Sequence, residues 1–455
     1  MPKRPFSLAF IDPGIRKAPF FLDLRQHLAP DIRCLYYSQR MIVSGFVRSA
    51  GLELFPARRE SVAPYSISDE ELQRAVGKKE LVLRGSKALR RARKVISTLS
   101  AFFDSQRIDA ILVWNGSNLV VSMAVYLARR RGITVLFAEH GYLPGTTQID
   151  CAGVNFEASI SPLVHSGQAQ RKADAEIDQA LDHEIESYRS GRPMRVLSPV
   201  VPAHFRRDWR SHLARVVHAK ASAAFFRFRA SVGKRVEQLP ERFVFLPFQV
   251  KKDSQLILHS PLMGNDMEGM VAAVHDSLAR ISPDTKIVVK FHPKEHPFTQ
   301  MGYDRLVRKY PDVLFIHNHS VARLIEAAQA VVTVNSTVGF EAIVLGKPVV
   351  TLGLNFYTRQ GLVETVSELA QLDDALSRAL TLPPDAVERR AFLRYIYRDF
   401  LALGSYHDFS EPSFTAIADR IRTLLEVSRT PSWPISSSQH DQLALASGEM
   451  SFNHA

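Results

Sequence analysis

The chain has 455 residues, of which 46% are hydrophobic and 23% are charged, and a formal net charge of +12. These proportions are those of a folded globular protein, and the length favours two domains. No run of 18 apolar residues occurs, and Asp12-Pro13-Gly14 interrupts the short apolar segment near the N-terminus. The sequence therefore predicts neither a transmembrane helix nor a signal peptide, and we expect a cytoplasmic protein.

The two cysteines, Cys34 and Cys151, lie in separate segments and have neither CxxC nor Cys/His spacing around them. This arrangement predicts buried thiols and gives no indication of a disulfide framework or a zinc site. No acidic DxD-like motif lies near the phosphate site proposed below, so we expect no metal ion either.

The first part of the chain alternates short apolar strands with amphipathic helices. The strand-like runs are FSLAFI (6–11), RCLYYS (33–38), DAILVWNG (109–116) and ITVLFAEHG (133–141). Strands separated by helices of this length are typical of parallel βαβ units. We predict a Rossmann-like domain over 1–156.

Residues 157–240 lack strand-like runs and predict a helical insertion or linker. The stretch 206–235 has nine basic residues against one acid, with Trp209 and Phe225 among its aromatic residues, and 84–94 is a second basic cluster. Such patches attract nucleic acid, anionic lipid headgroups or polyanionic chains. A solvated helix face is the alternative interpretation.

The alternation of strands and helices returns in the second half, at residues 242–249, 285–293, 313–318, 330–336 and 347–353. We predict a second Rossmann-like domain over 241–410, which binds a nucleotide-sugar. A helix over 411–428 and a disordered tail over 429–455 follow. The fold class is thus α/β and GT-B-like, with two Rossmann-type domains facing a cleft. In open parallel sheets, ligands bind beyond the carboxyl ends of the strands.

One predicted strand ends in Lys290-Phe291-His292-Pro293. Lys290 and His292 lie two residues apart and so share a face of the strand. Pro293 fixes the backbone after His292, so that the imidazole points toward the cleft, where phosphate oxygens would lie. We interpret the pair as a phosphate-binding element; the alternative is a histidine that orders a loop.

A second strand end reads Asn335-Ser336-Thr337 and continues through Gly339 into a helix with Glu341. Hydroxyl groups and free N–H groups at a helix start form an anion site. We expect Asn335, Ser336 and Thr337 to contact the nucleotide. We also expect Gly339 to allow a ligand close to the backbone and Glu341 to accept hydrogen bonds from ribose hydroxyls. The alternative is an ordinary N-cap followed by a dipole-stabilising acid.

Two further acids follow strands of different domains, Glu139 beside His140 in the first and Asp253 in the second. One carboxylate from each domain suits a nucleophile and an acid/base at an anomeric carbon. Either acid alone could equally cap a helix or order a loop.

Five stretches together resemble the bacterial capsule polysaccharide biosynthesis family of the KpsS and KpsC type, the retaining β-Kdo transferases. They read FIDPGIRKAPFFLDL, AEHGYLPGTTQIDCAGVN, FLPFQVKKDSQLILHSP, KFHPKEH and VNSTVGFEAIVLGKPVVTLGLNFY. The resemblance implies a GT-B fold, CMP-Kdo as the donor substrate, β-Kdo transfer with retention and no further cofactor.

The resemblance also implies roles for individual residues. Asp253 would be the nucleophile and Glu139 the acid/base. The CMP phosphate would contact Lys290 and His292, and Ser336, Thr337 and Glu341 would hold the phosphate and ribose. The Kdo carboxylate needs a basic or hydroxyl-lined pocket, to which Lys251, Lys252 or Arg16 would contribute.

The expected partners are a lipid-linked or glycan acceptor and an anionic membrane surface at the inner face of the inner membrane. Three alternatives stay open from the sequence. The first is a teichoic-acid-type glycerol-phosphate transferase with a CDP-activated donor. The second is a nucleic-acid-binding protein, although no recognised binding module accompanies the basic charge and we expect no nucleic-acid partner. The third is a non-catalytic glycan-binding relative.

Overall fold

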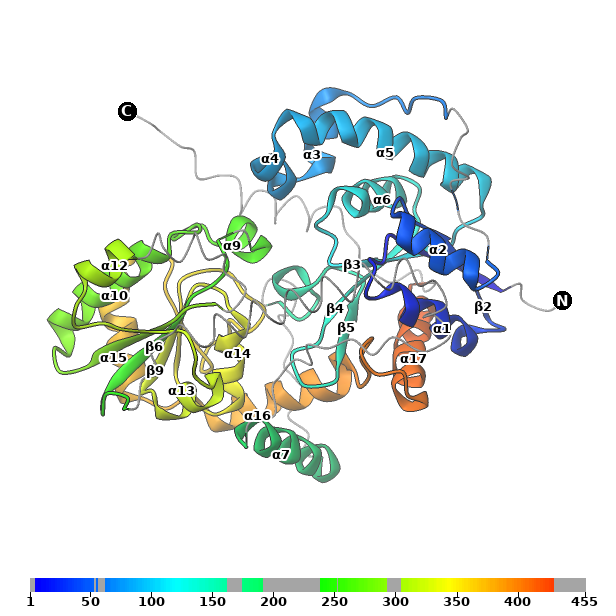
Figure 1. Ribbon diagram of the computed structural model, residues 1–455. Coiled ribbons are helices and arrows are strands. Elements are labelled where there is room, and N and C mark those ends of the chain that lie inside the picture. Colours follow the sequence, from blue (N-terminus) through cyan, green and yellow to red (C-terminus); the bar gives the residue numbers. More distant parts are fainter. Residues whose placement is uncertain are drawn as a thin grey trace.

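The computed structural model describes residues 5–52, 55, 62–161, 174–190, 238–251, 253–292 and 304–428. These residues form two α/β domains, each built on a six-stranded sheet (Figure 1). The predicted fold class, with two Rossmann-type domains, is confirmed. Four expected features lie outside the described residues: the basic stretch 206–235, the tail 429–455, Lys252 and Pro293.

The first sheet has the strand order β12-β5-β4-β3-β1-β2. Its strands are β1 (Phe6–Ile11), β2 (Ile32–Tyr37), β3 (Ala110–Trp114), β4 (Thr134–His140), β5 (Thr147–Asp150) and β12 (Leu401–Ala402). Strands β2, β1, β3 and β4 run parallel, and β5 and β12 continue the sheet with antiparallel pairings. The parallel strands are rich in Val, Ile and Leu because helices cover both of their faces.

The helices of this domain are α1 (Ala18–Leu28), α2 (Met41–Ser49), α3 (Asp69–Val76), α4 (Lys78–Arg84), α5 (Ser86–Ser105), α6 (Leu119–Arg130), η1 (Asn155–Glu157) and α17 (Glu411–Val427). Alternation along β1 divides the core into two layers. Leu8 and Phe10 face α1, α2 and α17, whereas Ala9 and Ile11 face α3, α5 and α6.

The second sheet is parallel throughout, in the order β11-β10-β9-β6-β7-β8. Its strands are β6 (Phe243–Pro247), β7 (Lys286–Lys290), β8 (Leu314–Ile316), β9 (Ala330–Thr333), β10 (Val349–Thr351) and β11 (Glu364–Thr365). Order β9-β6-β7 places β6 at the centre, so the ends of β6, β7 and β9 lie side by side. These are the strands whose ends the sequence singled out.

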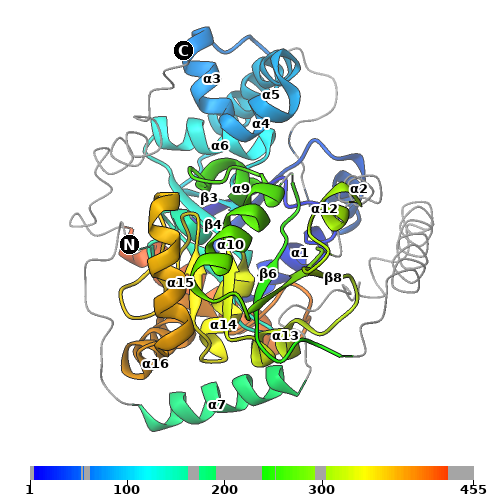
Figure 2. The ribbon, with the colours of Figure 1, turned by 90° about the vertical axis from the view of Figure 1, so that its left-hand side faces the viewer.

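The helices of the second domain are α7 (Ala175–Arg189), α9 (Ser254–His259), α10 (Met267–Ile281), α12 (Asp304–Lys309), α13 (Val321–Ala327), α14 (Thr337–Val344), η3 (Leu369–Gln371), α15 (Leu372–Thr381), α16 (Ala386–Tyr395) and η4 (Ile396–Phe400). Helices α10 and α15 cover one face of the sheet, and α13, α14 and α16 cover the other. Figure 2 faces this domain and shows α7 along its edge, beside α13 and α16.

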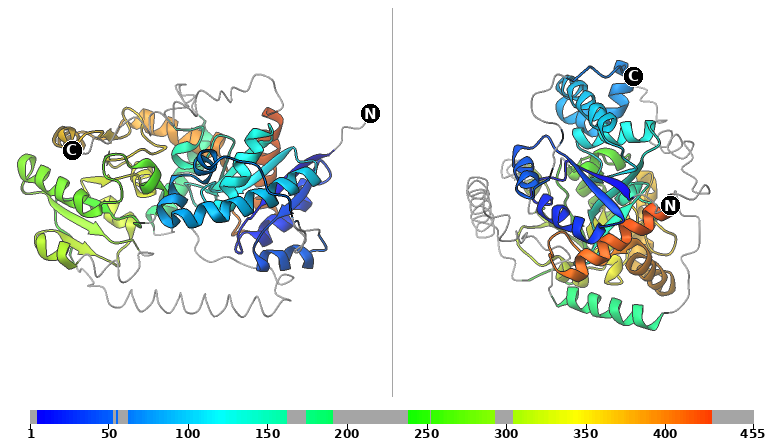
Figure 3. Two further views of the ribbon diagram at one scale, coloured as in Figure 1. Left: turned by 90° about the horizontal axis from the view of Figure 1, so that it is seen from above. Right: turned by 90° about the vertical axis from the view of Figure 1, so that its right-hand side faces the viewer.

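The chain returns to the first domain near its C-terminal end. After η4, β12 pairs with β5 of the first sheet, and α17 packs against α1 (Figure 3). The predicted second domain, 241–410, therefore extends past the point of return. A strand of two residues has no periodicity to reveal it.

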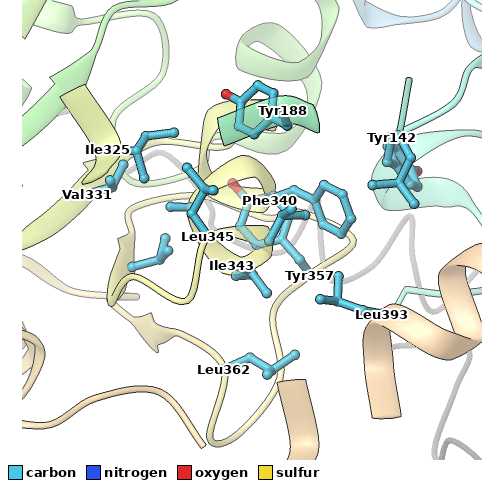
Figure 4. Close-up of a cluster of buried hydrophobic side chains, with 14 of the residues drawn as sticks. Tyr142, Tyr188, Ile325, Val331, Phe340, Ile343, Leu345, Tyr357, Leu362 and Leu393 are labelled. Atoms are coloured by element: carbon cyan, nitrogen blue, oxygen red, sulfur yellow. The ribbon is translucent and has the colours of Figure 1, made fainter. Parts of the chain in front are cut away.

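An aromatic cluster joins the two domains (Figure 4). Tyr142, which follows β4 in the first domain, stacks on Phe356 of the second, with ring centroids 3.6 Å apart and planes 8° apart. Phe340 of α14 lies 5.6 Å from the same tyrosine ring. Because these side chains are buried, separating the domains would expose a shared core.

Candidate functional site

Glu139 is held in one orientation at the end of β4. Its Oε1 accepts hydrogen bonds from Trp114 Nε1 at 3.1 Å and from the His140 backbone N–H at 2.9 Å. Its Oε2 accepts from Asn115 Nδ2 at 2.7 Å. Both oxygens are thus fixed by neighbours from adjacent strand ends, while 15% of the side chain stays exposed. This is a positioned carboxylate that a ligand can reach.

A chain of hydrogen bonds connects this carboxylate to Lys79 of α4. Lys79 Nζ donates to Ser117 Oγ at 2.9 Å, and Ser117 Oγ in turn donates to Asn115 Oδ1. Asn115 then donates to Glu139. The positive φ of Asn115, 66°, turns the backbone sharply after β3 and directs the Asn115 amide toward Ser117 and Glu139. Lys79 is therefore part of the Glu139 site.

Lys79 also lies close to Asp253, the acid predicted from the other domain. Burial lowers the pKa of Lys79, and the negative charges of Glu80, Asp253 and Glu139 act against that shift. Helix α4, which carries Lys79, lies beside α9, which begins after Asp253 (Figure 1). The structure thus places one cation within electrostatic reach of both predicted acids.

Asp253 has a structural role as well, because it is the N-cap of α9. Its Oδ1 accepts a hydrogen bond from the Gln255 backbone N–H at 2.9 Å. The cap fixes the carboxylate at the helix start, where the helix dipole favours a negative charge.

A cluster of aromatic and cationic side chains adjoins Glu139 through Trp114 and His140. Lys17 Nζ lies 4.5 Å from the ring centroid of Trp114 and 5.3 Å from that of Tyr406. His140 Nε2 lies 3.3 Å from the Tyr406 hydroxyl, and the ring of His407 stacks on His140 at 5.7 Å. The cluster combines positive charge with aromatic faces, with Lys17 over both the Trp114 and the Tyr406 rings.

Arg16 also lies near this cluster, because its charge acts on His407. Burial lowers the pKa of His407, and the positive charges of Lys17 and Arg16 lower it further. Arg16, which the resemblance assigned to a carboxylate pocket, therefore lies on the Glu139 side. Sequence reasoning missed Tyr406 and His407 because they follow the return of the chain to the first sheet, which no local pattern signals.

Asn335 was expected to contact the nucleotide, but its amide group is used inside the protein. Its Oδ1 accepts from Gln249 Nε2 at 2.9 Å, and its Nδ2 donates to the backbone oxygens of Gln255 at 2.8 Å and His259 at 3.1 Å. With 6% of its surface exposed, Asn335 ties the ends of β6 and β9 to α9. It positions the helix that Asp253 caps.

The start of α14 matches the predicted cap and differs in the role of its glycine. Ser336 Oγ accepts from the Val338 backbone N–H at 3.2 Å, and Ser336 and Thr337 are half-buried. A Cβ at Gly339 would lie 2.3 Å from the Tyr357 hydroxyl. Tyr357 in turn donates to the Ser336 backbone oxygen at 2.6 Å. Gly339 thus makes room for a buried tyrosine, and the expected approach of a ligand there is replaced by this packing.

Lys290 and Glu341 lie close together in the second domain. Lys290, at the end of β7, is 9% exposed; burial lowers its pKa, and the negative charge of Glu341 opposes that shift. Tyr188 of α7 donates a hydrogen bond to Glu341 Oε2, and its own pKa is raised, first by burial and then by Glu341. His292 is half-buried directly after β7. Tyr188 was not anticipated, because it belongs to a helix distant in sequence.

Helix α7 is clamped to α16 by ion pairs that hold Tyr188 in place. Asp178 Oδ1 accepts from Arg390 Nε at 2.8 Å and from Arg394 Nε at 2.6 Å. The hydrogen bonds from Arg394 and then Arg390 lower the pKa of Asp178. Because one carboxylate meets two guanidinium groups, the clamp fixes the rotation of α7 on the domain.

The other predicted residues that the structure describes are Lys251 and the two cysteines. Lys251 is half-buried in the loop after β6. Cys34 and Cys151 are half-buried, and burial raises the pKa of each thiol to about 12. Across the described ranges, no group of three or more His, Cys, Asp and Glu side chains is arranged to hold a metal ion. None of the helices that the structure describes is long and apolar enough to cross a membrane.

Two curated proteins are similar to this chain over much of its length. Protein FixF of Sinorhizobium fredii is 32% identical over 317 residues, which cover 70% of this chain and 65% of FixF, slightly less than two thirds of that protein. The capsule polysaccharide export protein KpsS of Escherichia coli is 27% identical over 284 residues, covering 56% of this chain and 69% of KpsS.

Two solved structures are similar at lower identity. KpsC of Thermosulfurimonas dismutans, titled a beta Kdo 2,7 transferase, has a TM-score of 0.43 and 15% identity, covering 93% of this chain and 100% of that one. A putative UDP-N-acetylglucosamine 2-epimerase from Listeria monocytogenes has a TM-score of 0.33 and 12% identity, covering 93% and 96%.

A family model described as capsule polysaccharide biosynthesis protein matches residues 109–374. This segment is more than half of the chain, and it contains Glu139, Asp253, Lys290 and Glu341. The chain therefore belongs to the capsule polysaccharide biosynthesis protein family.

Proposed function

We propose that this protein is a glycosyltransferase that moves Kdo from CMP-Kdo to a lipid-linked or glycan acceptor, with retention of the β configuration. The observation that carries the proposal is the position of Lys79, within electrostatic reach of Glu139 from the first domain and Asp253 from the second. Family membership supplies the setting, the synthesis of a capsule-type polysaccharide.

In this proposal the two acids have separate roles in a double-displacement reaction. The Asp253 carboxylate attacks the anomeric carbon of Kdo, and the bond to CMP breaks with its electron pair leaving on the phosphate. Glu139 then takes the proton of the acceptor hydroxyl, whose oxygen displaces Asp253 from the sugar. Two inversions at one carbon give net retention.

Lys79 is the residue best placed to compensate the carboxylate that Kdo carries at its anomeric carbon. Without this cation, a third carboxylate beside Glu139 and Asp253 would be repelled by both. The hydrogen bond from Lys79 to Ser117 fixes where the charge lies. Lys17 and Arg16 add positive charge on the Glu139 side.

The nucleotide is proposed to bind at the adjoining ends of β7 and β9. Lys290 and His292 would contact the phosphate, the hydroxyls of Ser336 and Thr337 would complete the phosphate site, and Glu341 would accept from the ribose. Support comes from the close approach of Lys290 and Glu341, since a nucleotide presents its phosphate and ribose together. We propose no metal ion or further cofactor for this step, because Lys290 and the start of α14 supply positive charge there.

The test is to incubate the purified full chain with CMP-Kdo and separate acceptors: phosphatidylglycerol vesicles, a Kdo-bearing glycolipid and a soluble Kdo oligosaccharide. CMP release and product mass are followed, and the anomeric configuration is read by NMR. We expect acceptor-dependent CMP release and a β-linked product. Absence of both CMP binding and turnover on every acceptor would overturn the proposal, and so would turnover with CDP-glycerol in place of CMP-Kdo.

A further inference from the structure

A sharp bend between α4 and α5 exposes a cationic surface on the first domain. Only Gly85 separates the two helices, and its φ of 52° and ψ of −138° lie in a region that favours glycine. We call residues 78–94, which comprise α4, Gly85 and the first part of α5, the cationic elbow.

The elbow exposes apolar side chains next to its charges. Val82 is 64% exposed and Leu83 is 40% exposed. Leu83 also lines an open hollow of about 430 Å³ together with Arg84, Lys87 and Arg91. Apolar and cationic side chains thus share one continuous surface.

The positive charge of this surface is largely uncompensated. The elbow has eight Lys and Arg residues and a single acid, Glu80. The acids of α3 and α4 are each engaged by an arginine, in the pairs Asp69 with Arg93, Glu70 with Arg74, Glu71 with Arg130, and Glu80 with Arg84. Four exposed cations have no recorded carboxylate partner within the described part of the chain: Lys87, Arg90, Arg91 and Lys94.

The elbow is continuous with the candidate site. Lys79, which lies near both Glu139 and Asp253, belongs to the same short helix as Val82 and Leu83. These residues are three and four positions apart, which is about one helical turn, or ~5 Å along the axis. Figure 1 shows α3, α4 and α5 at one end of the first domain, with α4 beside α9.

We propose that the cationic elbow docks the protein on an anionic lipid bilayer. Val82 and Leu83 enter the boundary between headgroups and acyl chains, and Lys87, Arg90, Arg91 and Lys94 meet the anionic headgroups. A nucleic acid would match the charge, but it offers no apolar layer for an exposed Val-Leu pair. Docking here brings headgroup-level acceptors to the site next to Lys79; this last step rests on the proposed function, whereas the docking itself does not.

The test uses the full chain in sedimentation with two kinds of vesicle, phosphatidylcholine alone and phosphatidylcholine with about one third phosphatidylglycerol. We expect binding to the anionic vesicles only, weakened by added salt. Replacing Lys87 and Arg91 by alanine removes two cations and weakens binding by about 25-fold, roughly fivefold each. The double variant Val82→Asp, Leu83→Asp weakens it at least about tenfold.

Two variants in the second domain serve as matched controls. Val387→Asp changes a valine that is 68% exposed on α16, and Lys286→Ala removes an exposed cation at the start of β7. Neither changes vesicle binding if the elbow is the docking surface. Thermal unfolding of every variant confirms that the fold is retained.

Three outcomes would overturn the proposal. The first is equal binding by the elbow variants and the wild type, and the second is no preference for anionic vesicles. The third is vesicle binding that the double variant Val82→Asp, Leu83→Asp leaves unchanged and that soluble polyphosphate abolishes. That result would identify a general polyanion site. Turnover on a soluble Kdo acceptor, measured in parallel, tests the proposed function separately. The elbow variants should keep that turnover and lose it on the lipid acceptor.

Discussion

The two sheets present acids at their carboxyl ends but hold them in different ways. In the second domain, Asp253 and Ser336 cap helices through hydrogen bonds to backbone groups two residues away. In the first, Glu139 is held by Trp114, and the adjacent His140 contacts Tyr406, which comes from the far end of the chain. At the carboxyl end of the second sheet, the second edge, these two caps therefore depend on local backbone bonds. At that of the first sheet, the first edge, Glu139 depends on contacts between distant segments.

The largest effect is expected from a variant of Asp253 that keeps the N-cap hydrogen bond and removes the negative charge. Asparagine is an equally good N-cap, so Asp253→Asn keeps the bond to the Gln255 backbone and removes only the negative charge. We expect kcat to fall by a factor on the order of 10⁴, as for other residues of a catalytic unit. The free energy of unfolding should change by less than about 0.5 kcal/mol. CMP release and thermal unfolding measure the two effects.

Asp266→Asn is the matched control. Asp266 caps α10 in the same domain, with its carboxylate accepting from the Gly269 backbone N–H at 2.9 Å. It should lose neither turnover nor stability. If Asp253→Asn behaves like Asp266→Asn, Asp253 is a cap and nothing more.

Glu139→Gln tests the first edge in the same way. Glutamine is isosteric but cannot take up a proton, so we expect kcat to fall by about 10³, the middle of the range for a general acid or base. One of the bonds from Trp114 and Asn115 then meets an NH₂ group, which costs about 1 kcal/mol of stability. The limb of the pH–rate profile that reports the acid/base should disappear.

Asp109→Asn provides the control for this variant. Asp109 lies at the amino end of β3, away from the site, and accepts from the Ser7 backbone N–H at 2.9 Å. Asp109→Asn should therefore affect only the stability of the fold and leave turnover unchanged. A Glu139→Gln enzyme with an unchanged pH–rate profile would show that Glu139 is not the acid/base.

The same difference explains what the sequence could predict. The caps at Asp253 and Ser336 were recognisable because a cap needs only its neighbours along the chain. The local pattern did not reveal that Gly339 makes room for Tyr357, since the tyrosine lies 18 residues further along the chain. Lys79 lies just before the basic cluster 84–94, and no local pattern marked it as part of a site. Only the packing of α4 beside α9 distinguishes it.

The return of the chain to the first sheet was equally hidden. β12 consists of Leu401 and Ala402, too short for any periodicity, and it pairs with β5 about 250 residues earlier. Tyr406 and His407 reach the site only because of this return. A domain boundary predicted only from the alternation of strands and helices therefore assigns Tyr406 and His407 to the wrong domain.

Low pH should lower the free energy of unfolding through His259, at the end of α9 in the second domain. Burial, and then the positive charge of Lys78, lower the pKa of His259 to about 4, compared with 6.5 for an ordinary histidine. Because the folded pKa is the lower one, this stabilisation is complete above about pH 6.5 and is lost as the pH falls toward 4. The loss is at most about 3 kcal/mol. Chemical denaturation at several pH values measures it.

His259→Gln should flatten this part of the stability profile, whereas His183→Gln should not. His183 is an exposed histidine on α7, so replacing it removes an imidazole without changing the buried group. The difference between the two variants isolates the buried group from carboxylates that titrate nearby. Parallel profiles for the two variants would contradict the assignment.

The smallest expected effect concerns a tertiary contact of the second edge, the hydrogen bond between Tyr188 and Glu341. Tyr188→Phe removes the hydrogen bond to Glu341 and leaves the ring in the aromatic core. If that bond orients Glu341 toward the ribose, the Kd for CMP and the KM for CMP-Kdo should rise roughly tenfold, with kcat nearly unchanged. Tyr397→Phe is the control, because Tyr397 packs against the same core. Equal effects from both variants would reduce Tyr188 to a packing residue, whereas an effect of Tyr188→Phe alone would show that the nucleotide site relies on a helix distant in sequence, as the Glu139 site does.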